Sequence, residues 1–325
     1  MFPSLPYLIC HALDATASMC HHAEVKPSSE TTQNHWLSPT VIGLLCGAAA
    51  ALFWAIALVS ARHGIAIGMT PLEIAIHRFF WVGLAFLPFV RRGAAADIIG
   101  VGIGRSIVLT LTGAVLVALL SNAGFLLVPL GHGGVIQPST AALSGLALAT
   151  VVFKERVRPT RIVGALALVG GLCIIGYEAV STIGLHGILG DLAFVGAGLS
   201  FAIFTVLLKF WNIQPIRAVA ITNVLALVLL PIEYFTSGFQ PMIEAGFREN
   251  LVLALVQGVL SGALSIYLFT RAVVLLGAAK AAVFPALVPP FTLLTGYLFL
   301  GIVPTALQLI GLVMVLAGFH LTQKS

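Results

Sequence analysis

The feature that most constrains this chain is a series of long stretches that carry almost no charge. Ten stretches of about 20 residues are dominated by apolar side chains, and each is long enough to cross a bilayer as an α-helix. Short polar or basic segments separate them. Only 8% of the residues are charged, whereas soluble domains carry about 25%. We therefore expect an integral membrane protein.

These stretches are apolar on all sides, whereas the strands of a membrane barrel alternate between lipid-facing and lumen-facing residues. Backbone groups inside a bilayer must also be paired within the protein, and a helix pairs its own. The sequence therefore predicts an all-α integral membrane fold with ten transmembrane helices. The predicted helices cover Val41–Ser60, Pro71–Val90, Ser106–Val128, Gly134–Phe153, Arg161–Ala179, Ile188–Phe210, Ile216–Phe235, Leu251–Thr270, Ala281–Gly301 and Thr305–Leu321.

The basic residues support this count and indicate an orientation. With the N-terminus in the cytoplasm, thirteen of the 16 Lys and Arg residues fall on the cytoplasmic side. Arg62 and Arg248 fall outside, and Arg78 falls within the second helix. Short cytoplasmic loops of membrane proteins are enriched in basic residues. We therefore expect a multi-pass protein of a cell membrane, such as the bacterial inner membrane, with both termini in the cytoplasm.

The sequence also repeats itself. Five helices is an odd number, so a second copy of a five-helix unit must be inserted upside down, as in many secondary transporters. We predict two inverted repeats, residues 39–180 and residues 187–322. A shift of 147 residues without a gap aligns identical residues of the two halves, among them the pairs Gly43 and Gly190, Pro138 and Pro285, Gly164 and Gly311, and Gly171 and Gly318.

Residues 1–38 differ from the rest because they are polar and contain no long apolar run. We expect a disordered tail, or residues that precede the true start of the protein. Two of the four cysteines lie there, in the steps Cys10-His11 and Cys20-His21-His22. Their spacing fits neither a zinc site nor a disulfide framework, so we expect no metal site and no cofactor.

Several ordered segments resemble one known family. They are Ala51-Leu52-Phe53-Trp54-Ala55, Thr70-Pro71-Leu72-Glu73, His77-Arg78-Phe79, Val152-Phe153-Lys154-Glu155-Arg156, Tyr267-Leu268-Phe269-Thr270-Arg271-Ala272, Pro285-Ala286-Leu287-Val288-Pro289 and Gln308-Leu309-Ile310-Gly311. No single segment is specific, but in this order and at this spacing they resemble the EamA-type transporters of the drug/metabolite transporter superfamily. The resemblance covers residues 41–322.

The resemblance implies a ten-helix bundle around a central cavity that opens to one side of the membrane at a time. It also implies export or facilitated movement of small metabolites, such as amino acids, or of drugs. One position departs from the family pattern, because Ile302 follows Gly301 where the family has an acidic residue. Glu155 keeps the acidic residue in the first half. The departure puts in doubt a gating or capping role for an outer-loop carboxylate.

Polar side chains within the predicted helices are candidates for the substrate cavity, because such groups are costly in a bilayer unless they meet partners or water. Arg78 could contact an anionic group of a substrate or act as a structural anchor. Glu73 precedes it by five residues and lies on a different helix face, so the two are poor partners. Packing or interhelical hydrogen bonding is the alternative for the others. The candidates are Trp54, His77, Arg78, Asn122, Gln137, Ser139, Gln257 and Tyr267.

Proline marks three positions where a predicted helix could break. Pro138 lies within the fourth predicted helix, and Pro285 and Pro289 lie within the ninth. A proline removes one backbone hydrogen bond, and broken backbone often lines the binding site of a transporter. We expect these residues to act as hinges or to line the cavity, with simple packing as the alternative.

Carboxylates are scarce within the predicted helices. Glu178, Asp191 and Glu233 fall near the predicted outer ends, where we expect water to solvate them. No carboxylate is evident in the middle of a span, which weakens a proton-driven mechanism without excluding it. The Gly-x4-Gly-Lys-Ser/Thr loop of ATP-driven pumps is also absent from the sequence.

Together these features predict a secondary transporter or facilitator of small metabolites that works by alternating access. Its expected partners are a small-molecule substrate, the lipid bilayer and a second copy in a homodimer. We expect no nucleic-acid partner, because the basic residues lie between membrane spans. The alternatives are a membrane sensor or scaffold and a membrane-embedded enzyme. An enzyme is disfavoured because no catalytic set is evident, and Ser121 and His132 are eleven residues apart.

Overall fold

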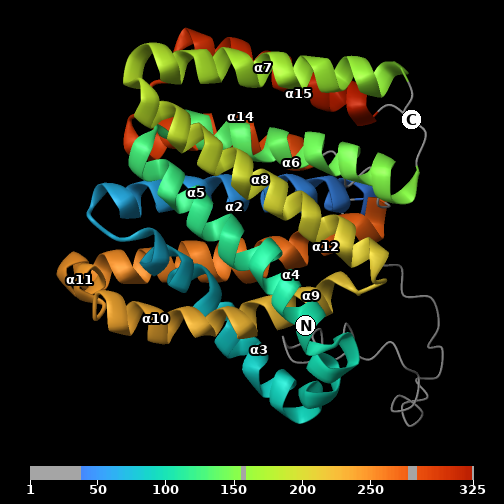
Figure 1. Ribbon diagram of the computed structural model, residues 1–325, viewed down its shortest axis with the longest axis vertical. Helices are drawn as coiled ribbons and strands as arrows, with labels where there is room; N and C mark the ends of the chain where they lie inside the picture. Colours follow the sequence, from blue (N-terminus) through green and yellow to red (C-terminus); the bar gives the residue numbers. More distant parts are fainter. Residues whose placement is uncertain (1–37, 155–158, 277–283, 324–325) are drawn as a thin grey trace.

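The structure is a computed structural model that describes residues 38–154, 159–276 and 284–323. Helices make up nearly all of these residues, and no strand occurs among them. Most of the helices run side by side along one common direction (Figure 1). The prediction of an all-helical, multi-pass membrane protein is confirmed, because several of these helices are long and apolar enough to cross a membrane.

The first half of the chain forms helices that correspond to the first five predicted spans. Helix α4 continues through the π-helix η1 into α5, so these three elements form one long helix. The elements are α2 (Pro39–Ala66), α3 (Pro71–Val101), α4 (Ile103–Thr110), η1 (Leu111–Val115), α5 (Leu116–Leu127), α6 (Leu130–Phe153) and α7 (Pro159–Ile183).

The second half follows the same order with more irregular segments. A 3₁₀ turn η2 joins α9 to α10, the π-helix η3 joins α11 to α12, and a 3₁₀ turn η4 precedes α14. The elements are α8 (Leu185–Phe210), α9 (Pro215–Leu225), η2 (Ala226–Val228), α10 (Leu229–Thr236), α11 (Gln240–Leu253), η3 (Ala254–Leu264), α12 (Ser265–Leu276), η4 (Phe284–Leu287), α14 (Val288–Leu300) and α15 (Ala306–Gln323).

Six helical stretches of the described residues meet the length and hydropathy expected of a membrane span. They are Pro39–Ala66, Ile103–Leu127, Leu130–Val152, Leu185–Phe210, Arg217–Thr236 and Gln240–Leu276. Three shorter apolar helices cover Pro159–Ile175, Phe284–Leu300 and Ala306–Leu321, and α3 covers the second predicted span. Residues 281–283 of the ninth predicted span lie outside the described residues. The count of ten spans and the inverted layout stay predictions.

Local sequence signals explain where two of the helices begin. The Glu73 carboxylate accepts the backbone N–H of Thr70 at 2.9 Å, and the Thr70 hydroxyl accepts the N–H of Glu73 at 3.1 Å. This reciprocal arrangement is a capping box, which pairs N–H groups that a helix start leaves free. Thr305 and Gln308 form the same arrangement at the start of α15, with distances of 3.4 and 3.1 Å.

Glycines bring the backbones of α7 and α15 into direct contact. A Cβ atom on Gly171 would lie 2.8 Å from the carbonyl oxygen of Gly311, and one on Gly318 would lie 2.7 Å from that of Gly164. Small residues allow such close approach between membrane helices. These four glycines are the two pairs that the 147-residue shift aligns, so the repeat signal in the sequence marks a real packing surface.

A second close approach joins α6 to α8. A Cβ atom on Gly198 of α8 would lie 2.5 Å from the carbonyl oxygen of Gln137 and 2.9 Å from the backbone nitrogen of Ala141. Helix α8 also packs along α5, where Phe194 and Phe125 make an edge-to-face contact with ring centroids 4.9 Å apart. The first and second halves of the chain are therefore tightly joined along α8.

The structure adds one helix that the sequence analysis does not predict. Residues 240–250, between the seventh and eighth predicted spans, form the first part of α11, which then continues into η3 and α12. Gly246 interrupts α11 with φ 80° and ψ 170°, a conformation that suits glycine. Few apolar residues occur between Gln240 and Asn250, so the hydropathy signal alone misses this segment.

Two carboxylates are not solvated as expected. Asp191 is only 9% exposed and Glu233 only 1% exposed. Glu233 accepts a hydrogen bond from the Ser237 hydroxyl, and Asp191 lies against a histidine from α6. The expectation that water surrounds these two groups is wrong. Around Asp191, α6 and α8 begin before the predicted spans and enclose the carboxylate, and α10, which carries Glu233, packs against α3. The side chain of Glu178 lies outside the described residues.

Candidate functional site

A cluster of buried polar side chains lies where α2, α3 and η3 meet. The Gln257 amide of η3 donates to the carbonyl oxygen of Ala57 at 2.7 Å and to the hydroxyl of Ser60 at 3.0 Å, both on α2. Gln257 is 3% exposed. It therefore joins the second half of the chain to the first. Its position in a π-helix is notable because π-helical segments are frequent at functional sites.

Arg78 belongs to the same cluster. One guanidinium nitrogen of Arg78 on α3 donates to the Ser261 hydroxyl of η3 at 3.0 Å. Within the part of the chain that the structure describes, Arg78 forms no ion pair with a carboxylate. Glu73 is occupied in the capping box at the start of α3, as the spacing of the two residues predicts. The positive charge of Arg78 is therefore left without an anionic partner among the described residues.

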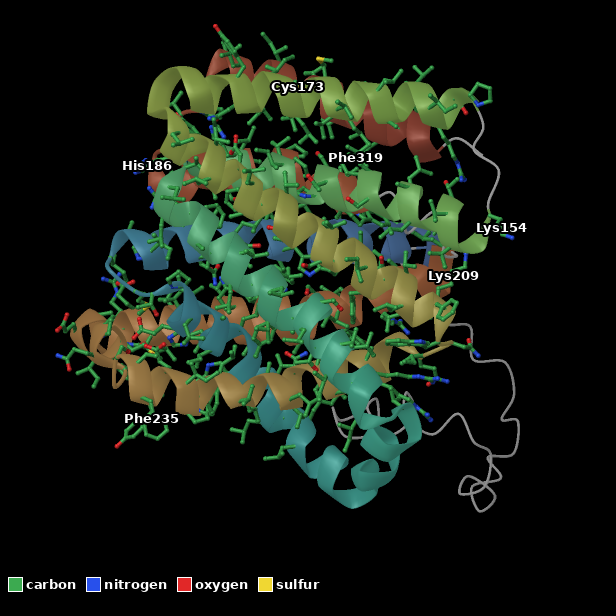
Figure 2. All side chains as sticks on the ribbon, in the orientation of Figure 1. Lys154, Cys173, His186, Lys209, Phe235 and Phe319 are labelled. Carbon is green, nitrogen blue, oxygen red and sulfur yellow. The ribbon has the colours of Figure 1, made fainter. Side chains whose placement is uncertain are left out.

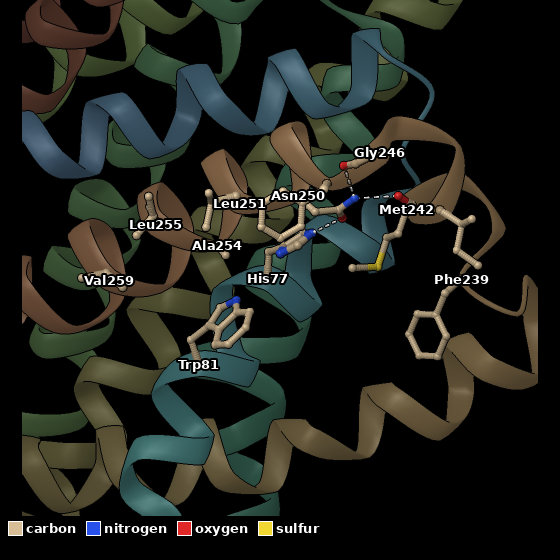
Figure 3. A pocket seen from close by; sticks show the side chains of 12 residues that line it. His77, Trp81, Phe239, Met242, Gly246, Asn250, Leu251, Ala254, Leu255 and Val259 are labelled. Atoms are coloured by element: carbon tan, nitrogen blue, oxygen red, sulfur yellow. Dashed lines mark hydrogen bonds between the residues drawn. The ribbon is translucent and has the colours of Figure 1, made fainter.

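His77 lies beside Arg78 and faces α11. Its Nε2 atom lies 3.0 Å from Oδ1 of Asn250. The Asn250 amide nitrogen donates to the carbonyl oxygens of Met242 at 2.6 Å and Gly246 at 2.7 Å, which fixes Oδ1 as the atom that faces His77. His77 Nε2 must then be the donor of this bond. Figure 3 shows the two side chains meeting at the inner wall of a groove.

This groove lies between α3, the start of α11 and η3, and has a volume of about 540 Å³. Apart from His77 and Asn250, its walls are formed by apolar side chains and backbone. Trp81 and Phe239 lie on different sides of the open space in Figure 3. An apolar groove with two polar groups at its wall suits a small amphipathic molecule or a lipid chain.

A second polar cluster lies between α3, α5 and α6. The Ser121 hydroxyl lies 2.8 Å from Oε1 of Gln137, and the Asn122 amide donates to the carbonyl oxygen of Pro71 at 3.0 Å. The Ser139 hydroxyl donates within its own helix to the carbonyl of Val135 at 2.7 Å. Asn122 and Gln137 thus make interhelical contacts, whereas the Ser139 hydroxyl is hydrogen-bonded within its own helix.

Trp54 and Tyr267 are not part of either cluster. Trp54 packs against Phe269 with ring centroids 5.4 Å apart, which fits the packing alternative. Tyr267 is 40% exposed. The described contacts bring His77, Arg78, Asn122, Gln137 and Gln257 into the two polar clusters or the groove beside them, and they leave Trp54 and Tyr267 outside these sites.

The three prolines behave differently from one another. Pro138 lies inside α6, which continues through it without a break in its helical assignment. Pro289 lies in the first turn of α14, where its missing N–H costs nothing because that group has no helical partner. Pro285 lies in the 3₁₀ turn η4. A helix interruption thus occurs beside Pro285 and Pro289, whereas a hinge at Pro138 stays a prediction.

Sequence reasoning missed several residues that the structure brings into these contacts. Ser261 and Asn250 pair with Arg78 and His77, and both lie in the region where the helix between residues 240 and 276 was only partly predicted. His132 and Asp191 pair across α6 and α8 at 2.9 Å. The Thr70-x-x-Glu73 spacing of a capping box could have identified the role of Glu73 in advance.

The described residues hold no group of three or more His, Cys, Asp or Glu side chains that could bind a metal ion. Cys46 and Cys173 are free thiols. The cysteines and histidines of the tail lie outside the described residues.

Comparisons with known proteins agree with this architecture. One solved structure, described only as the crystal structure of a protein, matches with a TM-score of 0.58 and 19% sequence identity, over 87% of this chain and 95% of the other. This likeness shows the fold alone. A search of curated protein sequences found no match. The model of the EamA-like transporter family matches twice, over residues 41–177 and 188–322. The chain therefore belongs to the EamA-like transporter family.

Proposed function

We propose that the protein is a secondary transporter or facilitator that moves small metabolites or drugs across the cytoplasmic membrane by alternating access. Membership of the EamA-like transporter family supports a general role in transport. The specific support is the first polar cluster, in which Arg78 meets Ser261 and Gln257 meets the Ala57 carbonyl across the two halves of the chain. Polar groups within a membrane-spanning helix are costly unless they contact polar partners or a substrate. Export is the direction that we propose.

An inverted repeat underlies the proposed mechanism, and paired structural features support it. The π-helix η1 lies at the position that the 147-residue shift aligns with part of η3. The helices α6 and α14 both end on residues in the left-handed region, Lys154 with φ 54° and Gly301 with φ 65°, which the same shift aligns. Irregular helices at matched positions provide two related places where the bundle can bend.

The pattern of helix packing is also symmetric. Helix α2 packs on α12 and α14, and its counterpart α8 packs on α5 and α6. Helices α7 and α15 pack on each other at the edge of the bundle. The contacts of α2 with α12 and α14 thus have counterparts in those of α8 with α5 and α6. We propose that the two halves rock against each other around the polar clusters, as inverted-repeat transporters do.

The distribution of charge supports an orientation with both termini in the cytoplasm. Figure 2 shows Lys154 and Lys209 at one end of the bundle and His186 and Phe235 at the opposite end. Loops with basic residues favour the cytoplasmic side. We therefore place the end that carries Lys154 and Lys209 inside the cell, and the corner between α10 and α11 outside. A homodimer stays a prediction.

Arg78 indicates the chemistry of the substrate. A guanidinium group in a low-dielectric environment attracts anions more strongly than it does in water, and its planar shape suits a carboxylate. We propose that Arg78 contacts an anionic group of the substrate, such as the carboxylate of an amino acid. Ser261 then positions the guanidinium between α3 and η3.

Transport by purified protein in liposomes tests this proposal. With a panel of labelled amino acids and other small metabolites, we expect saturable uptake of at least one anionic or zwitterionic class. Arg78→Gln is expected to reduce this uptake by at least about tenfold, since losing a charge-assisted contact costs roughly 1.5 to 3 kcal/mol. The measurement is the initial rate at several substrate concentrations.

Arg248→Gln is the matched control, because Arg248 is also an arginine but is exposed at the α11 segment. It should transport at the wild-type rate. Equal rates for Arg78→Gln and wild type would remove Arg78 from the substrate site. If folded wild-type protein moved no compound faster than empty liposomes, the transport proposal would fail, and the sensor or scaffold alternative would be favoured.

A further inference from the structure

A buried histidine and a buried aspartate face each other across the two halves of the chain. Nδ1 of His132, in the first turn of α6, lies 2.9 Å from Oδ1 of Asp191, in the second turn of α8. His132 is 1% exposed and Asp191 is 9% exposed. Neither residue takes part in the polar clusters around Arg78 and Gln137, so the proposed substrate contacts do not explain this pair.

The carboxylate of Asp191 is only half satisfied by the protein. Its second oxygen, Oδ2, is buried and accepts no hydrogen bond from any residue that the structure describes. A buried ionised carboxylate normally accepts several hydrogen bonds, because leaving it without donors costs several kcal/mol. Glu73 shows the contrast, since both of its oxygens accept backbone N–H groups. Backbone donors thus hold both oxygens of Glu73, whereas Asp191 has only its contact with His132.

The helices that surround the pair contribute several uncharged groups beside it. Phe125 of α5 and Phe194 of α8 pack against Gly133, and Gln308 of α15 lies against Gly131. On α6, α7, α8, α14 and α15, the other titratable or charged residues that the structure describes are either exposed or lie at the opposite helix end. The exposed ones are His186 on α8, Cys173 and Tyr177 on α7 and Tyr297 on α14, and those at the opposite end are Lys154 at the end of α6, Arg161 on α7, Lys209 on α8 and His320 on α15. On α2, which packs against α5 and α6, Arg62 and His63 lie toward the same end as the pair and are partly buried, and His63 pairs with Glu249.

One proton on the pair would cancel its net charge while it is buried. With one proton the pair is neutral, either as an imidazolium and a carboxylate or as an imidazole and a carboxylic acid. Without it the pair carries a net negative charge among apolar side chains, which is unfavourable. Because the two groups interact directly, the proton belongs to the pair and not to either residue.

The proton affinity of the pair should also change during transport. The hydrogen bond joins α6 of the first half to α8 of the second, so separation of the halves at this end would admit water. Water stabilises the deprotonated pair, and the proton would then leave. A site whose proton affinity differs between two conformations couples proton binding to the conformational change.

We propose that His132 and Asp191 form the proton-binding site that couples this protein to a transmembrane pH gradient. The inference rests on the proposed transport function for its coupling role. In the proposed orientation the pair lies near the outer end of α6 and α8, where it exchanges its proton with the external medium when the halves separate.

Proton binding can be tested without a substrate. The sequence contains three aspartates, Asp14, Asp97 and Asp191, so isotope labelling of aspartate isolates very few carboxyl bands in the infrared spectrum. In lipid-embedded wild-type protein we expect one labelled carboxyl band that titrates in step with a change in a histidine ring band. Asp191→Asn and His132→Asn should each abolish this coupled change. An aspartate spectrum that is the same in wild type and Asp191→Asn would overturn the proton site.

Glu249→Gln serves as the matched control. Glu249 also lies 2.9 Å from a histidine, His63, but that pair is partly exposed, so its removal should leave the labelled aspartate band unchanged. The coupling role is tested in liposomes with and without a pH gradient. Wild type and Glu249→Gln should show a stimulation on the order of tenfold, which Asp191→Asn should lose while still moving substrate down its own gradient.

The two proposals fail in different ways. If a pH gradient still stimulated transport in both Asp191→Asn and His132→Asn, the coupling site would be overturned. The transport function itself would not be affected by this result. Absence of flux from folded wild-type protein would overturn the transport function and its coupling, whereas the infrared titration would still decide whether the pair binds a proton. If Asp191→Asn does not fold, His132→Asn and the infrared titration of wild type still decide whether the pair binds a proton.

Discussion

Gly318→Val is expected to remove most of the folded protein from detergent extracts. A Cβ atom on Gly318 would lie 2.7 Å from the carbonyl oxygen of Gly164 and 2.8 Å from the backbone nitrogen of Leu168. These atoms belong to the backbone of α7 and cannot move aside as the end of a side chain can. Relief of the clash requires α15 to separate from α7, and we expect a loss of about 3 kcal/mol or more.

The measurement is the thermal unfolding midpoint of the purified protein, followed by intrinsic fluorescence and size-exclusion chromatography. We expect the midpoint to fall by at least about 5 °C. Gly145→Val is the matched control, because Gly145 lies inside α6 and a Cβ atom there meets nothing within 4 Å. It should unfold close to wild type. Equal stability of the two variants would show that the contact between α7 and α15 is looser than the structure has it.

The same contact shows what the sequence could predict about the fold. Hydropathy located a helix at every predicted span, because the need to pair backbone groups in lipid leaves a helix as the simplest solution. The shift of 147 residues selected Gly164, Gly171, Gly311 and Gly318. It could not show that each glycine packs against the non-aligned one, because the antiparallel arrangement of α7 and α15 follows from tertiary packing.

The candidate site was predicted only in part, for a physical reason. Each helical polar residue was recognised singly from its cost in a bilayer, which found Arg78, Gln137 and Gln257. Their partners could not be recognised in this way, because Ser261 and the Ala57 carbonyl are inconspicuous in a sequence and are separated from them by many residues. Whether a polar group is satisfied depends on contacts between helices, which periodicity does not reveal.

Asp191 was misjudged for a related reason. Its position near a predicted helix end suggested solvation, since the predicted span begins only three residues earlier. In the structure α8 begins at Leu185, and α6 begins with His132 in its first turn, so two helices extend beyond the predicted spans and enclose the carboxylate. Small errors in helix ends thus decide whether a charge is exposed or buried.

Glu73→Ala is expected to loosen the outer corner of the protein between α10 and η3. The Glu73 carboxylate is 0% exposed, and it accepts the backbone N–H of Thr70 at 2.9 Å and that of Met242 at 2.8 Å. The first bond caps α3 and the second holds the start of α11 against it. Its loss leaves two partly buried N–H groups without their partner, at up to about 1 to 3 kcal/mol each.

Hydrogen exchange followed by mass spectrometry measures this effect directly. Amides of residues 239–250 should exchange faster in Glu73→Ala, whereas those of α7 should not change, since Figure 1 shows α7 on the far side of the bundle from α11. Glu244→Ala is the control within the same corner, because Glu244 is exposed and bonds only Gln240 among the described contacts. It should change the stability by less than about 0.5 kcal/mol.

Glu73→Gln separates the two roles of the carboxylate. A glutamine side chain keeps one acceptor oxygen, so it can satisfy Thr70 or Met242 but not both. If the bond to Met242 holds α11 in place, this variant should show an exchange rate between those of wild type and Glu73→Ala. Since Asn250 also bonds the Met242 carbonyl and contacts His77, release of α11 should open the groove in Figure 3. Wild-type exchange in Glu73→Ala would mean that Asn250 alone is sufficient to hold α11 in position.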